Sequence, residues 1–416
     1  MSLTETKSRS CPRAMLHGSL TETKSRSCPR AMLHGGLRGA GILVSMAIVA
    51  WGCGSSTSDA PPTSAGDAAP TTCAELPASG VDVATALSKY PRLSDYCLFD
   101  VVKSNGRAKL VPKSGVLPYD LNTPLFSDYT RKARFVWLPK GTSATYTAEG
   151  AFTFPIGTIL IKTFGFAADL RKPDEDVTLI ETRLLVQTAQ GWTALPYVWA
   201  DDQSDASLQL GGSVRPTTFL AADGASVSAN YLLPSSTQCG TCHTNDASVL
   251  ELLGPKAKNL NRDFAYDTGS ENQLAHWTKV GALSGAPAPS AAPKMARWDD
   301  PSTGSVEDRS RAWLEMNCAH CHDEHRTART TGLYLPTTQT DPAKLGVCKP
   351  PVAAGPGSGG LKLDVVPGKP DESILVFRIG STTPGLMMPA LGRSVVHKEG
   401  VELVRAWIAG MSGACK

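Results

Sequence analysis

Histidine is scarce in this chain of 416 residues, which has 8 His in all and none between His34 and His243. The same stretch contains no C-x-x-C pair. Histidine is a frequent general acid or base and the commonest metal ligand. The first half of the chain therefore offers no candidate for a catalytic or metal centre, and the residues that carry chemistry belong to the second half.

The chain also lacks a large excess of charge of one sign. Its formal net charge is +3. Residues 1–52 contribute seven Lys or Arg and only two Glu, so the remainder has a net charge of about −2. A near-neutral chain gives no indication of nucleic-acid binding, and we expect no nucleic-acid partner.

No permanent membrane helix is predicted at the N-terminus, because the apolar run at residues 42–50 is too short to span a bilayer. Residues 2–18 recur unchanged as residues 19–35, and Met32 fits as the true start. Arg38 followed by the apolar run then predicts an export signal. The run ends in a segment similar to a bacterial lipobox, which predicts lipidation of Cys53; the alternative is an ordinary cleaved signal peptide.

What the chain does contain is two copies of C-x-x-C-H, the attachment sequence for haem c. Two copies are improbable by chance with 11 Cys and 8 His. The thiols of each copy would add to the porphyrin vinyl groups, and the following His would bind the iron. A zinc site, disulfides within the pairs and a thioredoxin-like pair are the alternatives, but zinc gives no reason for His after both second cysteines. The two copies predict two covalently attached haems, on Cys239, Cys242 and His243 and on Cys318, Cys321 and His322.

The second iron ligand at the second motif is predicted to be Met388, which lies before Pro389 and just ahead of the C-terminal helix. A Met on such a loop commonly supplies the distal sulfur in cytochromes c, and Met/His ligation raises the reduction potential. Met387 is the reserve candidate. His320 and His325 are too close to the proximal side to serve.

At the first motif, the sequence leaves three possibilities for the distal iron ligand: His276, Met295 or no protein ligand at all. His276 would lie on a predicted helix, and Met295 on a Pro/Ala-rich loop. Lys256 and Lys294 are weaker candidates. An iron without a protein ligand would bind peroxide, oxygen or another small molecule.

Four cysteines remain beyond the leader, the lipidation site and the two motifs. An even number in an oxidising compartment predicts disulfides. Local pairing would join Cys73 to Cys97 and Cys348 to Cys415, although four cysteines allow three connectivities.

The predicted fold class is multidomain α+β, with an N-terminal β-rich sandwich-like domain followed by two small, mostly α-helical cytochrome c-like domains. Gly, Pro and Asp separate apolar runs that predict strands, and Ala189-Gln190-Gly191 predicts a hairpin turn. The predicted strands are Arg134–Leu138, Ala151–Phe154, Thr158–Phe166, Val177–Thr188 and Ala194–Ala200. The predicted boundaries are 1–53 for the leader and signal, 54–74 for a flexible tether, 75–234 for the β-rich domain with a short helical lead-in, 235–300 for the first haem domain and 301–416 for the second.

Several segments between the motifs resemble those of a family of exported dihaem c-type cytochromes from Gram-negative bacteria, many of them lipoproteins. The segments are Pro118–Tyr129, Arg134–Pro139, Gln238, Arg309–Asn317, Val366–Leu375 and Met388–Gly392. The resemblance covers most of residues 80–412. It implies the architecture and the two haems, and it names no substrate.

The sequence therefore predicts a lipid-anchored dihaem cytochrome of the periplasm or outer membrane, which carries electrons between redox partner proteins. One alternative is a dihaem peroxidase or related oxidase with an open iron at the first site. Another is a haem-containing sensor or binding module that uses the β-rich domain.

Overall fold

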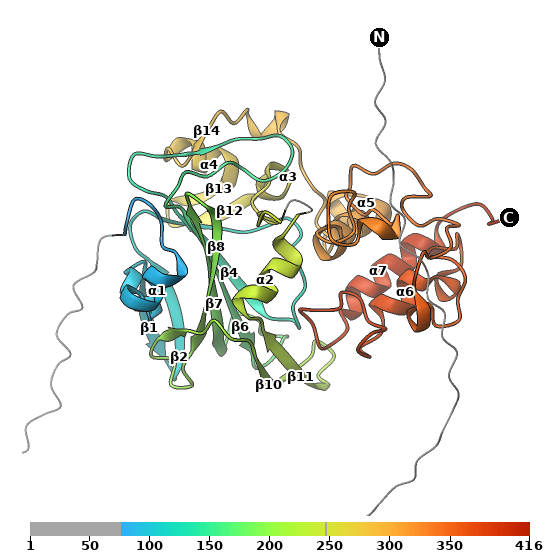
Figure 1. Cartoon of the computed structure of the whole chain (residues 1–416), viewed down its shortest axis with the longest axis horizontal. Helices are drawn as coiled ribbons and strands as arrows, with labels where there is room; N and C mark the ends of the chain where they lie inside the picture. Colours follow the sequence, from blue (N-terminus) through green and yellow to red (C-terminus); the bar gives the residue numbers. More distant parts are fainter. Residues whose placement is uncertain (1–75, 246–247) are drawn as a thin grey trace, which may run out of the picture. The chain divides into compact units, whose positions relative to one another are not determined.

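The protein is described from a computed structural model that places residues 76–245 and 248–416 (Figure 1). The strands are β1 (Phe99–Ser104), β2 (Arg107–Pro112), β3 (Val116–Tyr119), β4 (Arg131–Trp137), β5 (Ala144–Thr145), β6 (Ile159–Ala167), β7 (Val177–Thr188), β8 (Gly191–Trp199), β9 (Ala206–Leu208), β10 (Ser213–Leu220), β11 (Ser226–Leu233), β12 (Asp263–Tyr266), β13 (Gly269–Asn272) and β14 (Leu283–Ser284). The α-helices are α1 (Val83–Lys89), α2 (Ser236–His243), α3 (Ala257–Leu260), α4 (Gln273–Lys279), α5 (Val306–Leu314), α6 (Ile374–Ile379) and α7 (Lys398–Ala409).

A six-stranded sheet with the order β3-β4-β6-β7-β8-β9 is the largest element of the fold. All its neighbouring strands are antiparallel. β7 has the bounds predicted from the sequence, and the turn to β8 lies at the predicted hairpin. Gly191 begins β8 with φ +106°, a conformation that favours glycine.

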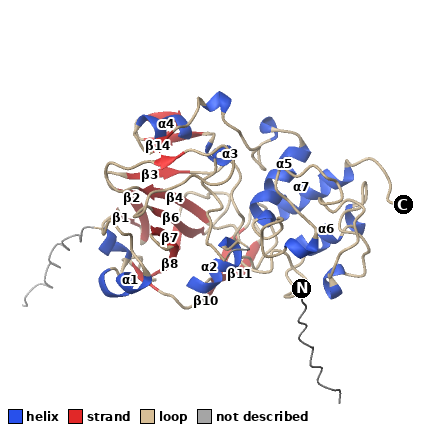
Figure 2. Ribbon diagram, turned by 45° about the horizontal axis from the view of Figure 1, so that its top comes forward, coloured by secondary structure: helices blue, strands red, loops and turns tan. Residues whose placement is uncertain are grey.

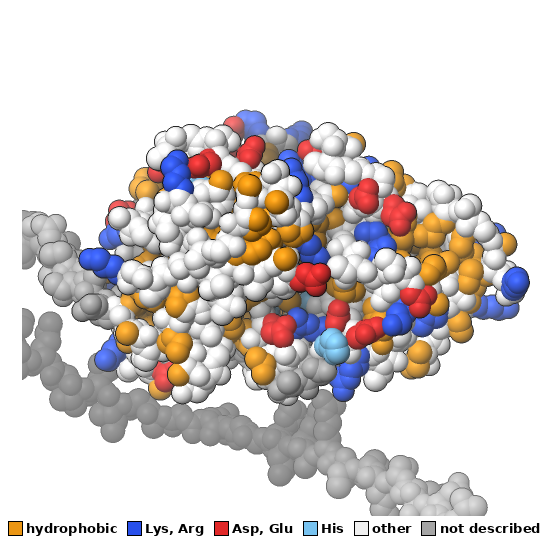
Figure 3. Space-filling model, turned by 90° about the horizontal axis from the view of Figure 1, so that it is seen from above, with side chains coloured by type: hydrophobic (Ala, Val, Ile, Leu, Met, Phe, Trp, Pro, Cys, Tyr) orange, Lys and Arg blue, Asp and Glu red, His pale blue; other side chains and the backbone are white. Residues whose placement is uncertain are grey.

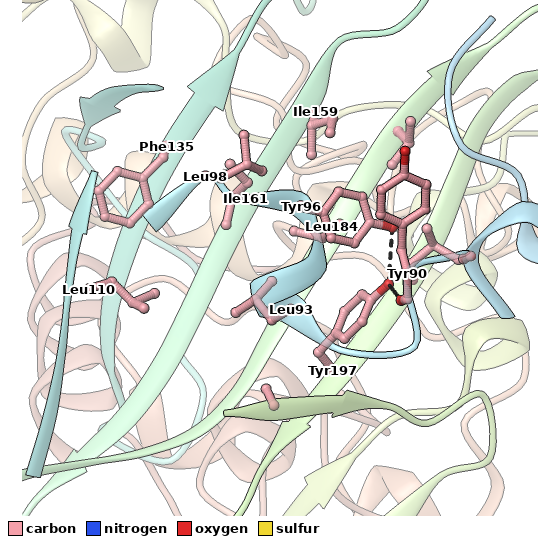
Figure 4. Close-up of a cluster of buried hydrophobic side chains, with 14 of the residues drawn as sticks. Tyr90, Leu93, Tyr96, Leu98, Leu110, Phe135, Ile159, Ile161, Leu184 and Tyr197 are labelled. Carbon is pink, nitrogen blue, oxygen red and sulfur yellow. Dashed lines mark hydrogen bonds between the residues drawn. The ribbon is translucent and has the colours of Figure 1, made fainter. Parts of the chain in front are cut away.

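One face of this sheet is covered by α1, a 3₁₀ helix at Leu93–Tyr96 and the β1–β2 hairpin. Aliphatic side chains of β6 and β7 pack there against a group of tyrosines (Figure 4). The Tyr197 hydroxyl donates a hydrogen bond to the Tyr90 carbonyl (2.8 Å), and Tyr90 and Tyr96 stack at 4.6 Å. The phenol oxygens are thus satisfied inside an apolar core, as buried hydroxyls require.

The opposite face of the sheet is covered by residues 250–316. Leu160 and Val136 of the sheet share one buried cluster with Leu260, Trp277 and Met316. Next to that cluster, the β10–β11 hairpin packs aromatic side chains on the same face. Residues 235–300 contain only short helices, the β12–β13 pair and β14, which pairs in parallel with the earlier strand β5, so this region buries its apolar side chains against the sheet.

Residues 301–416 form a second group of elements, in which α5 and α7 pack together (Figure 2). Gly400 lets the helices approach, because a Cβ there would lie 2.4 Å from Trp313 Nε1. Most of the remaining chain in this group is loop. A disulfide joins Cys348 to Cys415, as the local pairing predicted.

The predicted fold class is wrong. The molecule is β-rich with few helices, and its C-terminal half does not form two small, mostly helical domains. The physical reason lies in the composition of that half, where Pro and Gly recur too often for long helices and where the apolar side chains of residues 250–316 complete the core of the sheet. The β-rich region is built on a single six-stranded sheet with small satellite pairs.

The surface seen in Figure 3 carries acidic and basic side chains interspersed with small apolar areas. No helix in the described ranges has the length and apolar content needed to cross a membrane. The duplicated leader, the lipidation site at Cys53, the tether and Cys73 lie outside the described residues. Cys97, for which Cys73 was the predicted partner, is disulfide-bonded.

Candidate functional site: two adjacent haem-attachment motifs

The first C-x-x-C-H motif forms the last two turns of α2, directly after the sheet region. The helix begins with a capping box: Ser235 Oγ accepts from the Gln238 amide (3.1 Å), and Gln238 Oε1 accepts from the Ser235 amide (2.9 Å). These bonds satisfy amide groups that a helix start leaves unpaired. The fixed helix start determines where Cys239 and Cys242 point, and it gives Gln238 a structural role.

His243 is oriented by a hydrogen bond at one ring nitrogen. Its Nδ1 lies 2.8 Å from the Glu251 carbonyl oxygen and donates to it. The proton on Nδ1 leaves the lone pair on Nε2 free, which is the arrangement found in metal-ligating histidines. Burial lowers the pKa of His243 to about 4, so the imidazole is neutral at pH 7.

The second motif follows α5 through a π-helical turn at Glu315–Ala319. Asn317 fixes this turn, since its Nδ2 donates to the Trp313 carbonyl (2.9 Å) and its Oδ1 accepts from the Phe126 amide (2.8 Å). Burial raises the pKa of Cys318 to about 12, so this residue is a neutral thiol. Burial lowers the pKa of His322, as it does that of His243, and this keeps the His322 imidazole neutral.

The two motifs meet at their second cysteines. Cys321 Sγ lies 3.9 Å from the carbonyl oxygen of Thr241, the residue before Cys242, and both cysteines line the second of the two cavities described below. None of the four motif cysteines is disulfide-bonded. Two segments about 80 residues apart in the chain thus bring their reactive groups to one place.

Each motif borders a cavity. The first cavity contains Cys239, Cys242 and His243 and extends along the sheet. The second cavity contains Cys318, Cys321 and His322. Met388, predicted as an iron ligand, lines the second cavity with these three residues and also lines the first. The residues shared by both cavities include Cys242, Asn317, His320 and Met388.

The loop that carries Met388 is held by Arg393, which is buried. Its guanidinium donates to the carbonyls of Met388 (2.8 Å) and Ser381 (2.7 Å), and it reaches two further carbonyls on α6 at 3.2 and 3.4 Å. The Met388 amide donates to the Arg378 carbonyl (3.0 Å). Hydrogen bonds at both the amide and the carbonyl therefore fix the Met388 backbone.

Three basic residues on adjacent strands lie side by side on the wall of the first cavity. We call Arg134, Lys162 and Arg183 the basic row. Arg134 on β4 pairs with Lys162 on β6, which pairs with Arg183 on β7. Asp120 binds Arg134 (2.7 Å), and Glu181 binds Arg183 (2.5 Å). Sequence reasoning missed the row; the available signal was a charged residue inside otherwise apolar strands.

The two distal candidates predicted for the first motif lie away from its cavity. His276 stacks on Tyr266 at 3.5 Å, and its Nδ1 lies 2.9 Å from Glu271 Oε2. Met295 is buried in the core between the sheet and residues 250–316. It borders a separate polar cavity together with Lys256 and Lys294.

Within the described ranges, no three His, Cys, Asp or Glu side chains form a group that could hold a metal ion. Each haem iron would take only one His of a motif from these residue types, so this absence does not bear on haem. Comparisons with protein families, curated proteins and solved structures find no match to this chain. The resemblance to exported dihaem cytochromes accordingly stays a prediction.

Proposed function

We propose that this chain is an exported dihaem c-type cytochrome that carries electrons between redox partner proteins in the cell envelope. One observation carries the proposal: two C-x-x-C-H segments fold side by side, each with its own cavity and its own partly buried, neutral His. A lipid anchor at Cys53 in the periplasm or outer membrane is part of the proposal and rests on the sequence alone.

The residues around the cavities fit two haem groups. Each cavity is lined mostly by apolar side chains and has a thiol pair and an imidazole at one side. Two buried polar atoms on the cavity walls, Arg134 Nη2 and His320 Nδ1, have no hydrogen-bond partner among the described residues. Buried donors of this kind normally find a partner, and an anionic group in the first cavity would supply one for Arg134. Bound haem iron would give each site a one-electron redox couple.

The chain itself would bind, orient and shield the two groups. Cys239 and Cys318 are free of disulfides, as addition to a vinyl group requires, and burial raises the pKa of both thiols. The Glu251 carbonyl fixes the ring of His243, and Arg393 fixes the loop of Met388. The two motifs are adjacent, and Cys242 also lines the cavity of the second motif, which suits a carrier of single electrons.

The test is the covalent haem content of the full-length protein after expression with a cytochrome c maturation system. We expect the mass of two haems in the wild type and of one haem in each of two double variants, Cys239→Ala/Cys242→Ala and Cys318→Ala/Cys321→Ala. The control is Cys348→Ala/Cys415→Ala, which removes the disulfide between these two residues and should keep both haems. Absence of covalent haem from the wild type, or two haems in either motif variant, would refute the proposal.

A further inference from the structure

No hydrogen bond or ion pair among the described residues explains why a lysine occupies position 162. It lies in the middle of β6, where its neighbours Leu160 and Phe164 on the same face belong to buried clusters. Its amine makes no hydrogen bond or ion pair with any described residue and lies 4.8 Å from the centre of the Phe164 ring. Placing an amine among apolar neighbours without a carboxylate partner costs hydration free energy, so Lys162 calls for a functional explanation.

The basic row explains how this amine is kept uncharged. Burial, and then Arg134, Lys132 and Arg183, lower the pKa of Lys162 well below its usual value. The two carboxylates on this face are already bound to the arginines. A neutral amine has a free lone pair and can bind a metal.

The Lys162 side chain is partly exposed, and it lines the first cavity together with His243. The amine and the imidazole therefore border the same cavity, Lys162 from the sheet and His243 from α2.

We propose that Lys162 is the second axial ligand of the iron at the first motif, opposite His243. This inference rests on the proposed function, and it replaces an open coordination position with an amine. It gives the protein two unlike irons, one with His and Lys and one with His and Met.

Two of the other donors in the first cavity are already engaged. His397 Nδ1 accepts from Trp313 Nε1 (2.9 Å), and its ring stacks on Phe126 at 4.3 Å. Met316 Sδ accepts from Asn259 Nδ2 (3.0 Å) within the core. His320 lies between the two cysteines of the second motif and borders both cavities, and its Nδ1 has no hydrogen-bond partner among the described residues. Met388 is the donor of the second cavity.

The experiment uses the full-length protein loaded with two haems and compares Lys162→Leu and Lys162→Arg with the wild type. Leucine suits a strand and an apolar wall, and arginine keeps the positive charge but cannot bind iron. We expect one of the two haems in each variant to become high-spin and to bind carbon monoxide, while the other stays low-spin. Lys132→Leu is the control, because Lys132 is a partly exposed lysine of the same sheet that does not line the first cavity, and both haems of this variant should stay low-spin.

The wild type should bind no carbon monoxide at neutral pH, and its electron paramagnetic resonance spectrum should contain a His/amine species besides a His/Met species. Carbon monoxide binding to one haem of the wild type, or an unchanged low-spin spectrum in both Lys162 variants, would overturn the assignment. Failure of the proposed function is distinguishable, because the mass would then show fewer than two haems before any spectrum is compared.

Discussion

His397 illustrates how one buried side chain can make stability depend on pH. Burial lowers its pKa to about 4, although Glu399 acts in the opposite direction. In the unfolded chain a histidine titrates near 6.5. Between these values the unfolded chain binds the extra proton and the folded chain does not, so stability falls as the pH drops from about 6.5 to about 4. Protonation would also remove the acceptor for Trp313.

We expect this single group to contribute at most about 3 kcal/mol to the pH dependence of unfolding. The measurement is urea unfolding of the wild type and His397→Gln at several pH values between 7 and 4.5. Glutamine can still accept from Trp313 but does not titrate. The free-energy difference between the two proteins should shift in favour of the variant as the pH falls. A difference that is constant across this range would contradict the expectation.

At the scale of elements, the crossing of α5 and α7 depends on the absence of a side chain at Gly400. Alanine favours a helix by about 1 kcal/mol over glycine, but its Cβ here would overlap the indole of Trp313. We expect Gly400→Ala to lower the free energy of unfolding by about 1–3 kcal/mol, measured by urea denaturation. The control is Gly410→Ala, where the nearest atom would lie at an ordinary 3.5 Å and stability should change little.

The loop that carries Met388 depends on Arg393 for its conformation. Lysine at position 393 cannot donate to several carbonyls at once as the Arg393 guanidinium does. We therefore expect Arg393→Lys to loosen the loop, so that the haem at the second motif binds carbon monoxide and loses the absorption of a Met-ligated ferric iron. Arg405→Lys, which alters an ion pair with the exposed Asp371, should leave the spectrum unchanged.

The sequence predicts local elements well and the long-range packing poorly. Alternation and a hairpin turn determine β7, and its bounds were predicted correctly. The helical domains were predicted wrongly because a helix pattern around a C-x-x-C-H motif says nothing about where neighbouring apolar side chains pack. Trp277 and Leu260 complete the core of a distant sheet, which no local pattern reveals. Met388 was predicted from its place in the chain and lines the second cavity, whereas the place of Lys162 on the wall of the first cavity needed the strand register.

At the scale of the whole molecule, residues 120–129 act as a connecting segment between the sheet, residues 255–300 and the C-terminal group. Asn122 donates to the Lys258 carbonyl (2.9 Å), and Thr123 Oγ1 donates to the Ala296 carbonyl (2.8 Å). The Phe126 amide binds Asn317, the residue before the second motif. Pro118–Tyr129 is one of the segments on which the family resemblance rests. Its polar contacts thus position the second motif against the sheet region.

Asp128 makes the last of these contacts. Its carboxylate accepts from the Ser394 amide (2.7 Å), the Ser394 hydroxyl (3.0 Å) and the Val395 amide (3.0 Å), and it is only 1% exposed. Replacing it with alanine would leave buried donors unpaired where the C-terminal group meets the sheet region. We expect Asp128→Ala to lower the free energy of unfolding by about 3 kcal/mol.

The same variant should also uncouple the two parts of the molecule. The C-terminal group would then unfold or be cleaved by protease before the sheet region, whereas the wild type should lose both together; limited proteolysis and differential scanning calorimetry would detect the change. Asp174→Ala is the matched control, because that carboxylate binds Arg131 at the surface and its loss should cost at most about 1 kcal/mol. If Asp128→Ala unfolded in one step with the stability of this control, the connecting segment would not be what holds the two attachment motifs together.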